Sequence, residues 1–298
     1  MKATFISDEF SQDFAACLDF ADTLGLDSLE LRSVEGSSID ELTDDATHQL
    51  RAMSSDRDIQ ICGVDTFCFK HQYEARQNCD SLAKLDRAAD LACILGAPWL
   101  RIFAFWRQDE LDLAAIRDAV LDAARIVGQR PVRLLIENGT FSAVGSGARL
   151  ADLLDMVDLP QVGALWDPAN VVNGYWPETV DDGLACLRRH LVHIHVKNPQ
   201  SGEPGSMAFG PLRAGIIDWP KHLKRCADLS YDGYLSLETH WRSARTLAGR
   251  AQLDFPGGHD FSDGAEIATR DTMAELIDLI LAIPSGIDRA SIKRQELY

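Results

Sequence analysis

Four side chains able to bind a metal or to move a proton stand at the ends of short apolar segments of the sequence. Three are the carboxylates Glu137, Asp167 and Glu238, and the fourth is the imidazole of His195. Taken singly, each carboxylate is explained as well by contact with solvent or by capping of a following helix. Together, the four predict three carboxylates and one imidazole at the same level of neighbouring strands.

Three carboxylates that converge inside a closed structure repel one another strongly unless a cation lies between them. A set of oxygen ligands with one imidazole suits a hard divalent ion, unlike the thiolate sets typical of structural zinc. We therefore expect one divalent cation, with Mn²⁺ as the first choice and Mg²⁺, Co²⁺ or Zn²⁺ as alternatives.

The segment Leu191–Lys197 has two faces when it is read with a period of two. Apolar and nitrogen-bearing side chains alternate along it, namely Val192, Ile194 and Val196 against His193, His195 and Lys197. Such a strand suits a parallel barrel, in which helices cover the apolar face and the inner face reaches the C-terminal mouth. We interpret His193 as a hydrogen-bonded core histidine and His195, nearer the C-terminal end, as the ligand.

Short apolar strands alternate with amphipathic helices along the whole chain. Strands are predicted at Ala3–Ser7, Ser28–Arg32, Ile59–Asp65, Trp99–Ala104, Val132–Glu137, Val162–Asp167, Leu191–Lys197 and Tyr234–Glu238. Helices are predicted at Phe14–Gly25, Ile39–Ser54, Ser81–Leu95, Leu113–Val127, Ala148–Val157, Val180–His190, Trp219–Leu229 and Ala265–Leu281. This order predicts the α/β class and a single (β/α)₈ TIM barrel from residue 3 to residue 283, followed by a polar tail at residues 284–298.

Composition and charge exclude several classes of partner. A net charge of −17 repels phosphates and argues against nucleic acid as a partner. No apolar run is long enough to span a membrane, and the N-terminal residues lack a signal-peptide core. The seven cysteines lack a metal-binding spacing, so we expect reduced thiols and a cytoplasmic protein.

The order and spacing of five motifs resemble the sugar isomerase/epimerase superfamily with the xylose isomerase-like barrel. The motifs are Ile136-Glu137-Asn138, Trp166-Asp167-Pro168-Ala169-Asn170, His193-Ile194-His195-Val196-Lys197-Asn198, Gly215-Ile216-Ile217-Asp218-Trp219 and Leu237-Glu238-Thr239-His240. Three further segments resemble a subgroup described broadly as sugar phosphate isomerases/epimerases, namely Ser7-Asp8-Glu9, Glu30-Leu31-Arg32 and Arg101-Ile102-Phe103. The resemblance covers nearly the whole chain.

The resemblance implies a metal-dependent isomerase or epimerase of a sugar, a sugar phosphate or a related polyhydroxy carbonyl compound. Glu137, Asp167, His195 and Glu238 would hold the ion. Glu137 and Glu238 would also be catalytic, because one would remove a proton beside a metal-bound carbonyl and the other would return it from the opposite face.

Two alternatives to an isomerase stay open at this point. The first is a lyase on the same metal site, a dehydratase of a keto-inositol or a 3-keto sugar. The second is a non-catalytic partner or sugar-binding barrel, which the presence of every ligand position disfavours. We expect a small carbohydrate as the substrate and a homodimer or a homotetramer as the assembly.

Substrate contacts are expected on both sides of the barrel mouth. Lys197 and Asn170 lie next to metal ligands in the sequence and would contact substrate oxygens. Glu30, Arg32 and Lys70 would add contacts from the opposite side. For these three, an internal Glu–Arg ion pair and a surface lysine are equally good interpretations.

Aromatic residues in loops after the strands are expected to form part of the pocket wall, and Trp106, Phe69 and Trp241 are the candidates. Packing of each loop against a helix is the alternative for any one of them. The loop from Thr239 to Gly264 is long enough to suggest a function or an interface.

Two positions depart from the ketose 3-epimerases. Those enzymes carry an arginine a few residues after the metal histidine and a histidine three residues after the metal aspartate, where this chain has Ser201 and Asn170. A free ketohexose is therefore a poor candidate for the substrate. No clear phosphate cradle is present either, since residues 144–147 offer only a weak one at a helix start.

Overall fold

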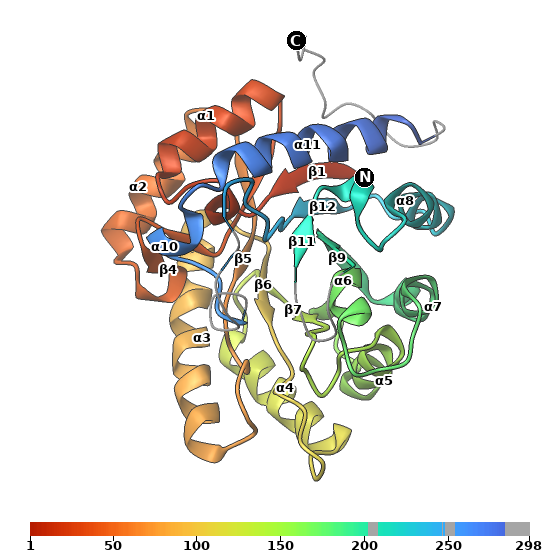
Figure 1. Ribbon diagram of the computed structural model, residues 1–298. Helices are drawn as coiled ribbons and strands as arrows, with labels where there is room; N and C mark the ends of the chain where they lie inside the picture. The colour runs from red at the N-terminus through yellow and green to blue at the C-terminus, as the bar shows by residue number, and fades with distance from the viewer. Residues whose placement is uncertain (202–207, 246, 248–253, 284–298) are drawn as a thin grey trace.

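The chain folds as a barrel of eight parallel strands with helices around it (Figure 1). The computed structural model describes residues 1–201, 208–245, 247 and 254–283, so the tail predicted at residues 284–298 lies outside the described residues. In sheet order the strands are β1 (Lys2–Phe5), β12 (Tyr234–Leu237), β9 (Leu191–Val196), β8 (Val162–Trp166), β7 (Arg133–Glu137), β6 (Trp99–Ile102), β5 (Gln60–Asp65) and β2 (Ser28–Leu31). An isolated parallel bridge between Ile6 and Glu30 brings the two edge strands together, so the barrel is nearly closed.

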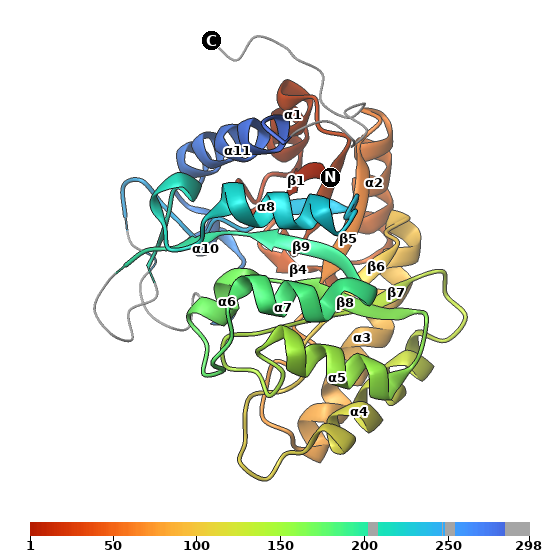
Figure 2. The same cartoon turned by 90° about the vertical axis from the view of Figure 1, so that its right-hand side faces the viewer.

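An outer layer of helices covers the apolar outer faces of the strands, and Figure 2 shows α11, α8, α7 and α5 following one another along one side. The layer consists of α1 (Phe14–Leu24), α2 (Asp44–Ser55), α3 (Ala75–Leu95), α4 (Leu113–Val127), α5 (Gly147–Val157), α7 (Val180–Cys186), α8 (Trp219–Asp228) and α11 (Glu266–Leu281). The main hydrophobic core fills the space between this layer and the strands. Within the described part of the chain, no helix has the length and apolar character needed to cross a membrane.

Shorter helices, turns and hairpins lie in the segments that connect the barrel strands to the outer helices. They are the helices α6 (Pro168–Val172) and α10 (His259–Ser262), the 3₁₀ turns η1 (Ser7–Glu9), η2 (Ile39–Glu41), η3 (Leu187–Arg189) and η4 (Leu212–Ala214), and the hairpins β3 (Ser33–Val34) with β4 (Ser37–Ser38) and β10 (Asn198–Pro199) with β11 (Phe209–Gly210). Pairs of two-residue strands lie below the length at which sequence periodicity is visible, and the sequence predicted neither hairpin.

The predicted barrel is confirmed. Each predicted strand and outer helix is present, and most have shifted ends, whereas α4 has the predicted bounds. The largest shifts are in the second and third helices. The first turn of the expected second helix is the separate turn η2, closed by Ser38 and Glu41, and Thr43 caps the true start of α2. Helix α3 begins at Ala75, six residues before the predicted start, although Ala75 is the one apolar residue of its first turn.

The N-terminal end of the barrel interior is filled by apolar side chains. Trp99 packs there with Leu135 and Leu165, and its ring centroid lies 4.6 Å from that of His193. Gly63 makes room for the indole, because a Cβ at this position would lie 2.0 Å from a ring carbon of Trp99. This end of the barrel is therefore a packed core.

The expected alternation of strand β9 is wrong at one residue. Val192 was predicted to face the helices, yet it packs against the interior group of Trp99, Leu135 and Leu165. The register against β8 shifts at this point, because Ala164 pairs with Leu191 whereas Leu165 pairs with His193. A bulge of this kind inserts one residue and interrupts the period of two, and from His193 onward the alternation is the predicted one.

Candidate metal and active site

Four neighbouring strands of the sheet bring the four predicted ligands together at their C-terminal ends. Glu137 ends β7, Asp167 follows β8, His195 lies in β9 and Glu238 follows β12. One ligand atom of each side chain lies within 4.8 Å of the others, and all four residues are buried. The shared strand-end positions in the sequence therefore correspond to one cluster in space.

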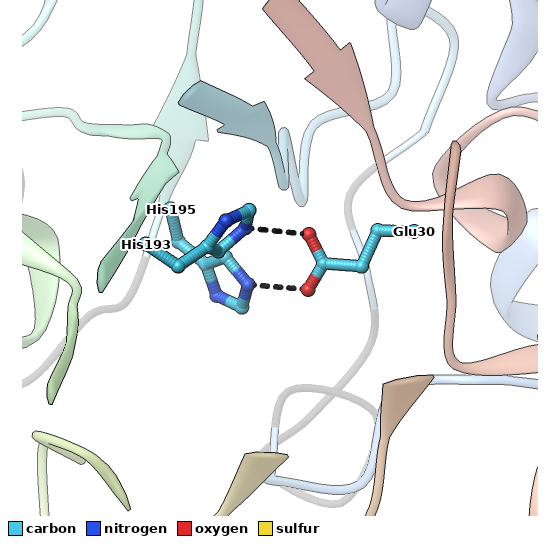
Figure 3. A group of neighbouring side chains, drawn as sticks. All are labelled: Glu30, His193 and His195. Atoms are coloured by element: carbon cyan, nitrogen blue, oxygen red, sulfur yellow. Dashed lines mark hydrogen bonds and ion pairs between the residues drawn. The ribbon is translucent and has the colours of Figure 1, made fainter. Parts of the chain in front are cut away.

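The imidazole of His195 is held from behind by a carboxylate on the opposite side of the barrel (Figure 3). Glu30 on β2 contacts both histidines of β9, with Oε1 2.8 Å from His195 Nε2 and Oε2 2.8 Å from His193 Nε2. Because an ionised carboxylate only accepts hydrogen bonds, both Nε2 atoms carry protons, and Nδ1 of His195 is the atom turned toward the cluster. His193 is the hydrogen-bonded core histidine that the sequence predicted.

Nδ1 of His195 is the atom on which the fit of a cation is best judged. It is buried, has no hydrogen-bond partner among the described residues, and lies 3.4 Å from Oε2 of Glu238 and 4.0 Å from Oε1 of Glu137. Burial lowers the pKa of His195, but Glu30 and Glu238 outweigh this effect and raise the pKa well above its usual value. A negative field that favours a proton on this ring also favours a metal ion, so the residues fit a divalent cation.

Two asparagines link the C-terminal ends of the neighbouring strands β7 and β8. Asn138 exchanges two hydrogen bonds of 2.8 Å with the backbone N–H and C=O of Asp167. Asn170 donates in return to Oε1 of Glu137 at 3.0 Å, and Thr140 donates to Asn170. These bonds explain why an asparagine follows both the glutamate motif and the aspartate motif.

Asp167 also begins a helix. Its Oδ1 accepts the backbone N–H of Ala169 and thereby caps α6, while Oδ2 faces the cluster. Both interpretations of a strand-end carboxylate therefore apply to this residue. Burial, with the negative charges of Glu137 and Glu238, raises the pKa of Asp167 to about 6.

Three buried cations offset the carboxylates. Nζ of Lys197 lies 2.5 Å from Oδ2 of Asp167 and also contacts Oε2 of Glu238, whose other oxygen lies 2.5 Å from Nη1 of Arg32. Arg101 donates to Oε2 of Glu137 at 2.9 Å. Burial raises the pKa of Glu238. Nearby positive charges, that of Lys197 first, have the larger effect in the opposite direction and leave this pKa well below its usual value.

A cavity of about 610 Å³, counted to its open mouth, lies against this cluster. Of the residues predicted for the site, those that line it are Phe69, Lys70, Trp106, Glu137, Asn170, Lys197 and Glu238. Trp241 is not among the lining residues and packs instead against the core. The long loop after β12 contributes Asp254 and Pro256 to the wall.

Two residues predicted to contact substrate lie outside the cavity lining. Glu30 binds the two histidines, and Arg32 forms ion pairs with Asp8, Glu9 and Glu238. Both side chains are fully buried, and no bond joins them to each other. Glu30 and Arg32 thus each form internal ion pairs, but with residues of other elements and not with each other. The spacing of residues along one strand cannot reveal such partners.

The aromatic side of the cavity is formed by two loops that are hydrogen-bonded to each other. Phe69 and Phe105 both have a φ of +62°, their rings lie 4.6 Å apart, and Phe105 N–H donates to Phe69 C=O at 2.9 Å. A positive φ is costly for a bulky side chain and persists only where its surroundings hold it. The strained loops after β5 and β6 therefore hold each other in place.

Sequence reasoning assigned no role to several residues that line the cavity, above all Arg101, His240, Phe103 and Phe209. Arg101 is the only charged residue of β6, which is a usable signal. His240 follows Glu238 by two residues, and its Nδ1 lies 2.6 Å from Oε1 of Glu9. Nothing in the sequence indicates that Phe209 returns to the site through the hairpin of β10 and β11.

Comparisons with known proteins agree with this architecture. A family model described as xylose isomerase-like TIM barrel matches residues 18–270. Among solved structures, the probable 3-DHS dehydratase AsbF, involved in petrobactin synthesis, from Bacillus anthracis has a TM-score of 0.71 at 18% identity, over 93% of this chain and 99% of that chain. D-Psicose 3-epimerase with D-tagatose from Clostridium cellulolyticum H10 has a TM-score of 0.71 at 15% identity, over 96% and 100%.

The IOLI protein, solved with a bound zinc atom, has a TM-score of 0.74 at 14% identity, over 96% of this chain and 100% of that chain. No curated protein sequence matches the chain. At these identities, the likeness to solved structures shows the fold.

Proposed function

The chain belongs to the xylose isomerase-like TIM barrel family, whose members are isomerases, epimerases and related dehydratases, and from this membership we propose a divalent-metal-dependent isomerase or epimerase of a small polyhydroxy carbonyl compound. The observation that supports it is the convergence of Glu137, Asp167, His195 and Glu238 within 4.8 Å. Two of these residues, Glu137 and Glu238, also line the cavity and can reach a substrate.

In this proposal the four clustered residues hold one divalent ion, Mn²⁺ as the first choice and Mg²⁺, Co²⁺ or Zn²⁺ as alternatives. Such an ion supplies positive charge that stabilises the negative charge developing on the substrate oxygen. Glu30 keeps the His195 ring in the orientation and tautomer that ligation needs, since it accepts a hydrogen bond from the Nε2–H group.

Proton transfer is assigned to the two glutamates. They approach from strands β7 and β12, which are separated in the sheet by β8 and β9, so they can flank a substrate from two sides. One carboxylate removes the proton from the carbon beside the carbonyl and keeps it, and the other, which carries a proton of its own, donates that proton to the opposite face. Arg101 and Asn170 hold Glu137 in place, and Arg32 and Lys197 hold Glu238.

A dehydratase on the same site is the second candidate, and the placement of Lys197 and His240 favours it. Both line the cavity beside Glu238, with His240 Nε2 3.7 Å from Oε1 of that carboxylate. In a dehydratase, the same proton is removed, the C–O bond on the next carbon breaks, and a proton from such a group leaves with the hydroxyl as water. One of the structures with this fold is named as a probable dehydratase.

The experiment that tests the proposal is turnover in deuterated water. Metal-loaded protein is incubated with a panel of ketoses, keto-inositols, 3-keto sugars and their acids and phosphates, and products are analysed by mass spectrometry and NMR. An isomerase or epimerase gives a product of unchanged formula with deuterium beside the carbonyl, whereas a dehydratase gives a product that has lost water. In metal-replete Glu137→Gln or Glu238→Gln protein, the rate falls by about 10²- to 10⁴-fold. Exchange at the wild-type rate in the double variant would remove both residues from the mechanism.

A further inference from the structure

Lys70 is the cation of the cavity lining for which the described part of the chain supplies no ion pair. The other two cations in the cavity lining have carboxylate partners: Arg101 pairs with Glu137 and Asp65, and Lys197 pairs with Asp167 and Glu238. Among the described residues, no ion pair and no hydrogen bond involves Nζ of Lys70. A lysine with this placement differs from the surface lysine that the sequence left open.

Aromatic rings lie around the Lys70 ammonium, and the carboxylates of Glu137 and Glu238 act on it through space, without forming an ion pair with it. Nζ lies 4.5 Å from the ring centroid of Phe103, 5.4 Å from that of Phe67 and 5.7 Å from that of Phe255. Burial, together with the positive charge of Arg101, lowers the pKa of Lys70 to about 8. Rings of this kind attract a cation but do not neutralise its charge. An anion that enters the cavity would therefore gain a strong, poorly screened partner.

On these grounds we infer that the substrate carries a carboxylate and that Lys70 is its counter-ion. The site then acts on a polyhydroxy carbonyl acid rather than on a neutral sugar. This inference rests on the proposed function, because it adds the charge of the substrate to the reaction proposed for the same cavity.

The position of Lys70 relative to the reacting groups suits a small molecule. Lys70 and Arg101 both contact the ring of Phe103, with Lys70 Nζ 4.5 Å and Arg101 Cζ 4.7 Å from its centroid. Arg101 in turn holds Glu137, one of the two glutamates proposed to transfer protons. A substrate whose carboxylate meets Lys70 can thus present a carbon to the glutamates within one compact molecule.

A single cation without an ion pair among the described residues favours a carboxylate over a phosphate. A phosphate carries nearly two charges and is bound by several donors at once, often the backbone N–H groups at a helix start. The candidate helix start in this chain is already occupied, because the N–H groups of Gly147 and Ala148 donate to the Glu178 carboxylate at 2.6 and 2.9 Å. The weak phosphate cradle indicated by the sequence is therefore filled by the protein itself.

The test compares probes that differ only in the group on one carbon. D-Fructose, D-fructose 6-phosphate and D-fructuronate share their ketose skeleton, and D-glucose, D-glucose 6-phosphate and D-glucuronate form a second set. Binding of each probe to Mn²⁺-loaded full-length protein is measured by calorimetry, without any need for turnover. We expect at least one acid to bind about tenfold or more tightly than its neutral counterpart, as a buried charge-assisted contact requires. Equal binding of the acid and its neutral counterpart in both sets would overturn the inference. Tighter binding of the phosphate than of the acid would also overturn it and would indicate a phosphate on the substrate.

Variants assign the preference to one side chain. In Lys70→Met, which keeps the length of the side chain, the ratio of acid to neutral affinity falls to about one, and Lys70→Arg restores most of it. Asp254→Asn tests for an internal counter-ion, because Asp254 lines the same cavity. An acid preference that changes little in Asp254→Asn supports the inference, whereas a rise of about tenfold or more in this variant would show that Asp254 already offsets the charge of Lys70 and would overturn it. Failure of the proposed function is separate, since it appears as absent Mn²⁺ binding or absent deuterium exchange in protein that still prefers acids.

Discussion

Glu30 on β2 and His195 on β9 face each other across the barrel interior, with Oε1 of the glutamate 2.8 Å from Nε2 of the histidine. The bond joins an early strand of the chain to a late one and sets which ring nitrogen faces Glu137, Asp167 and Glu238. Metal binding by His195 depends on this bond, because a ring with its proton on the other nitrogen presents no lone pair to the cluster.

Replacement of Glu30 by glutamine should therefore weaken metal binding without removing a ligand. An amide cannot accept from both histidines as the carboxylate does, so His195 loses its fixed tautomer, and the affinity for Mn²⁺ should fall about 10- to 100-fold in a calorimetric titration. His193→Gln is the matched control, because His193 binds the other oxygen of Glu30 and leaves the bond to His195 in place. Equal Mn²⁺ affinity in Glu30→Gln and wild type would exclude this positioning role.

Lys197 should stabilise the metal-free protein much more than the metal-loaded one. Its ammonium lies between Asp167 and Glu238, and Lys197→Met leaves these buried carboxylates without it. The free energy of unfolding without metal should fall by about 3–5 kcal/mol, since removal of one partner of a buried pair leaves an uncompensated charge. Added Mn²⁺ should recover most of this loss, because a divalent ion offsets the same carboxylates.

Urea denaturation with and without Mn²⁺ measures both effects. Lys221→Met is the control, since Lys221 also pairs with an aspartate, Asp181 at 2.6 Å, but its side chain is 59% exposed. Such a pair contributes no more than about 1 kcal/mol. A metal-free Lys197→Met protein as stable as this control would show that Lys197 does not balance the cluster.

The barrel was predictable from sequence because the same strand–helix pattern recurs along the chain. Apolar strands and amphipathic helices alternate from β1 to α11, and an error at one boundary leaves the order unchanged. Local chemistry moved the boundaries, as where Thr43 caps α2 after the separate turn η2. The bulge at Val192 was not predictable, because it follows from pairing with β8 and not from the composition of β9.

The metal cluster was predictable from positions along single strands, whereas the partners that these side chains meet across the barrel were not. The ligands Glu137, Asp167, His195 and Glu238 stand at equivalent strand ends, and a parallel barrel brings such positions together. One partner of Arg32, by contrast, is Glu238, 206 residues away, and one partner of Glu30 is His195, 165 residues away. Spacing along one strand indicates that a side chain points inward, but it does not identify what the side chain meets across the barrel.

Acid binding should depend on pH through Lys70. Its pKa is lowered to about 8 by burial, Arg101 and Lys197, against the opposing charges of Glu137 and Glu238. The ammonium form is the one that binds a carboxylate, so affinity should be full below pH 8 and should weaken by about tenfold per pH unit well above it. In Lys70→Arg this loss should vanish up to pH 10, since a guanidinium keeps its proton. Calorimetry from pH 6 to pH 10 measures both proteins, and a wild-type affinity for the acid that stays constant to pH 10 would contradict the assignment.

The most direct test of the account is a titration of metal-stripped protein with Mn²⁺, followed by calorimetry. Wild-type protein should bind one ion per chain, and Asp167→Ala should bind none at the same concentrations, because it lacks one of the four clustered ligands. Asp218→Ala is the control, since Asp218 also caps a helix, α8, but lies outside the cluster, so this variant should bind Mn²⁺ as wild type does. Absence of binding by the wild type, or equal binding by Asp167→Ala, would contradict a metal site formed by Glu137, Asp167, His195 and Glu238.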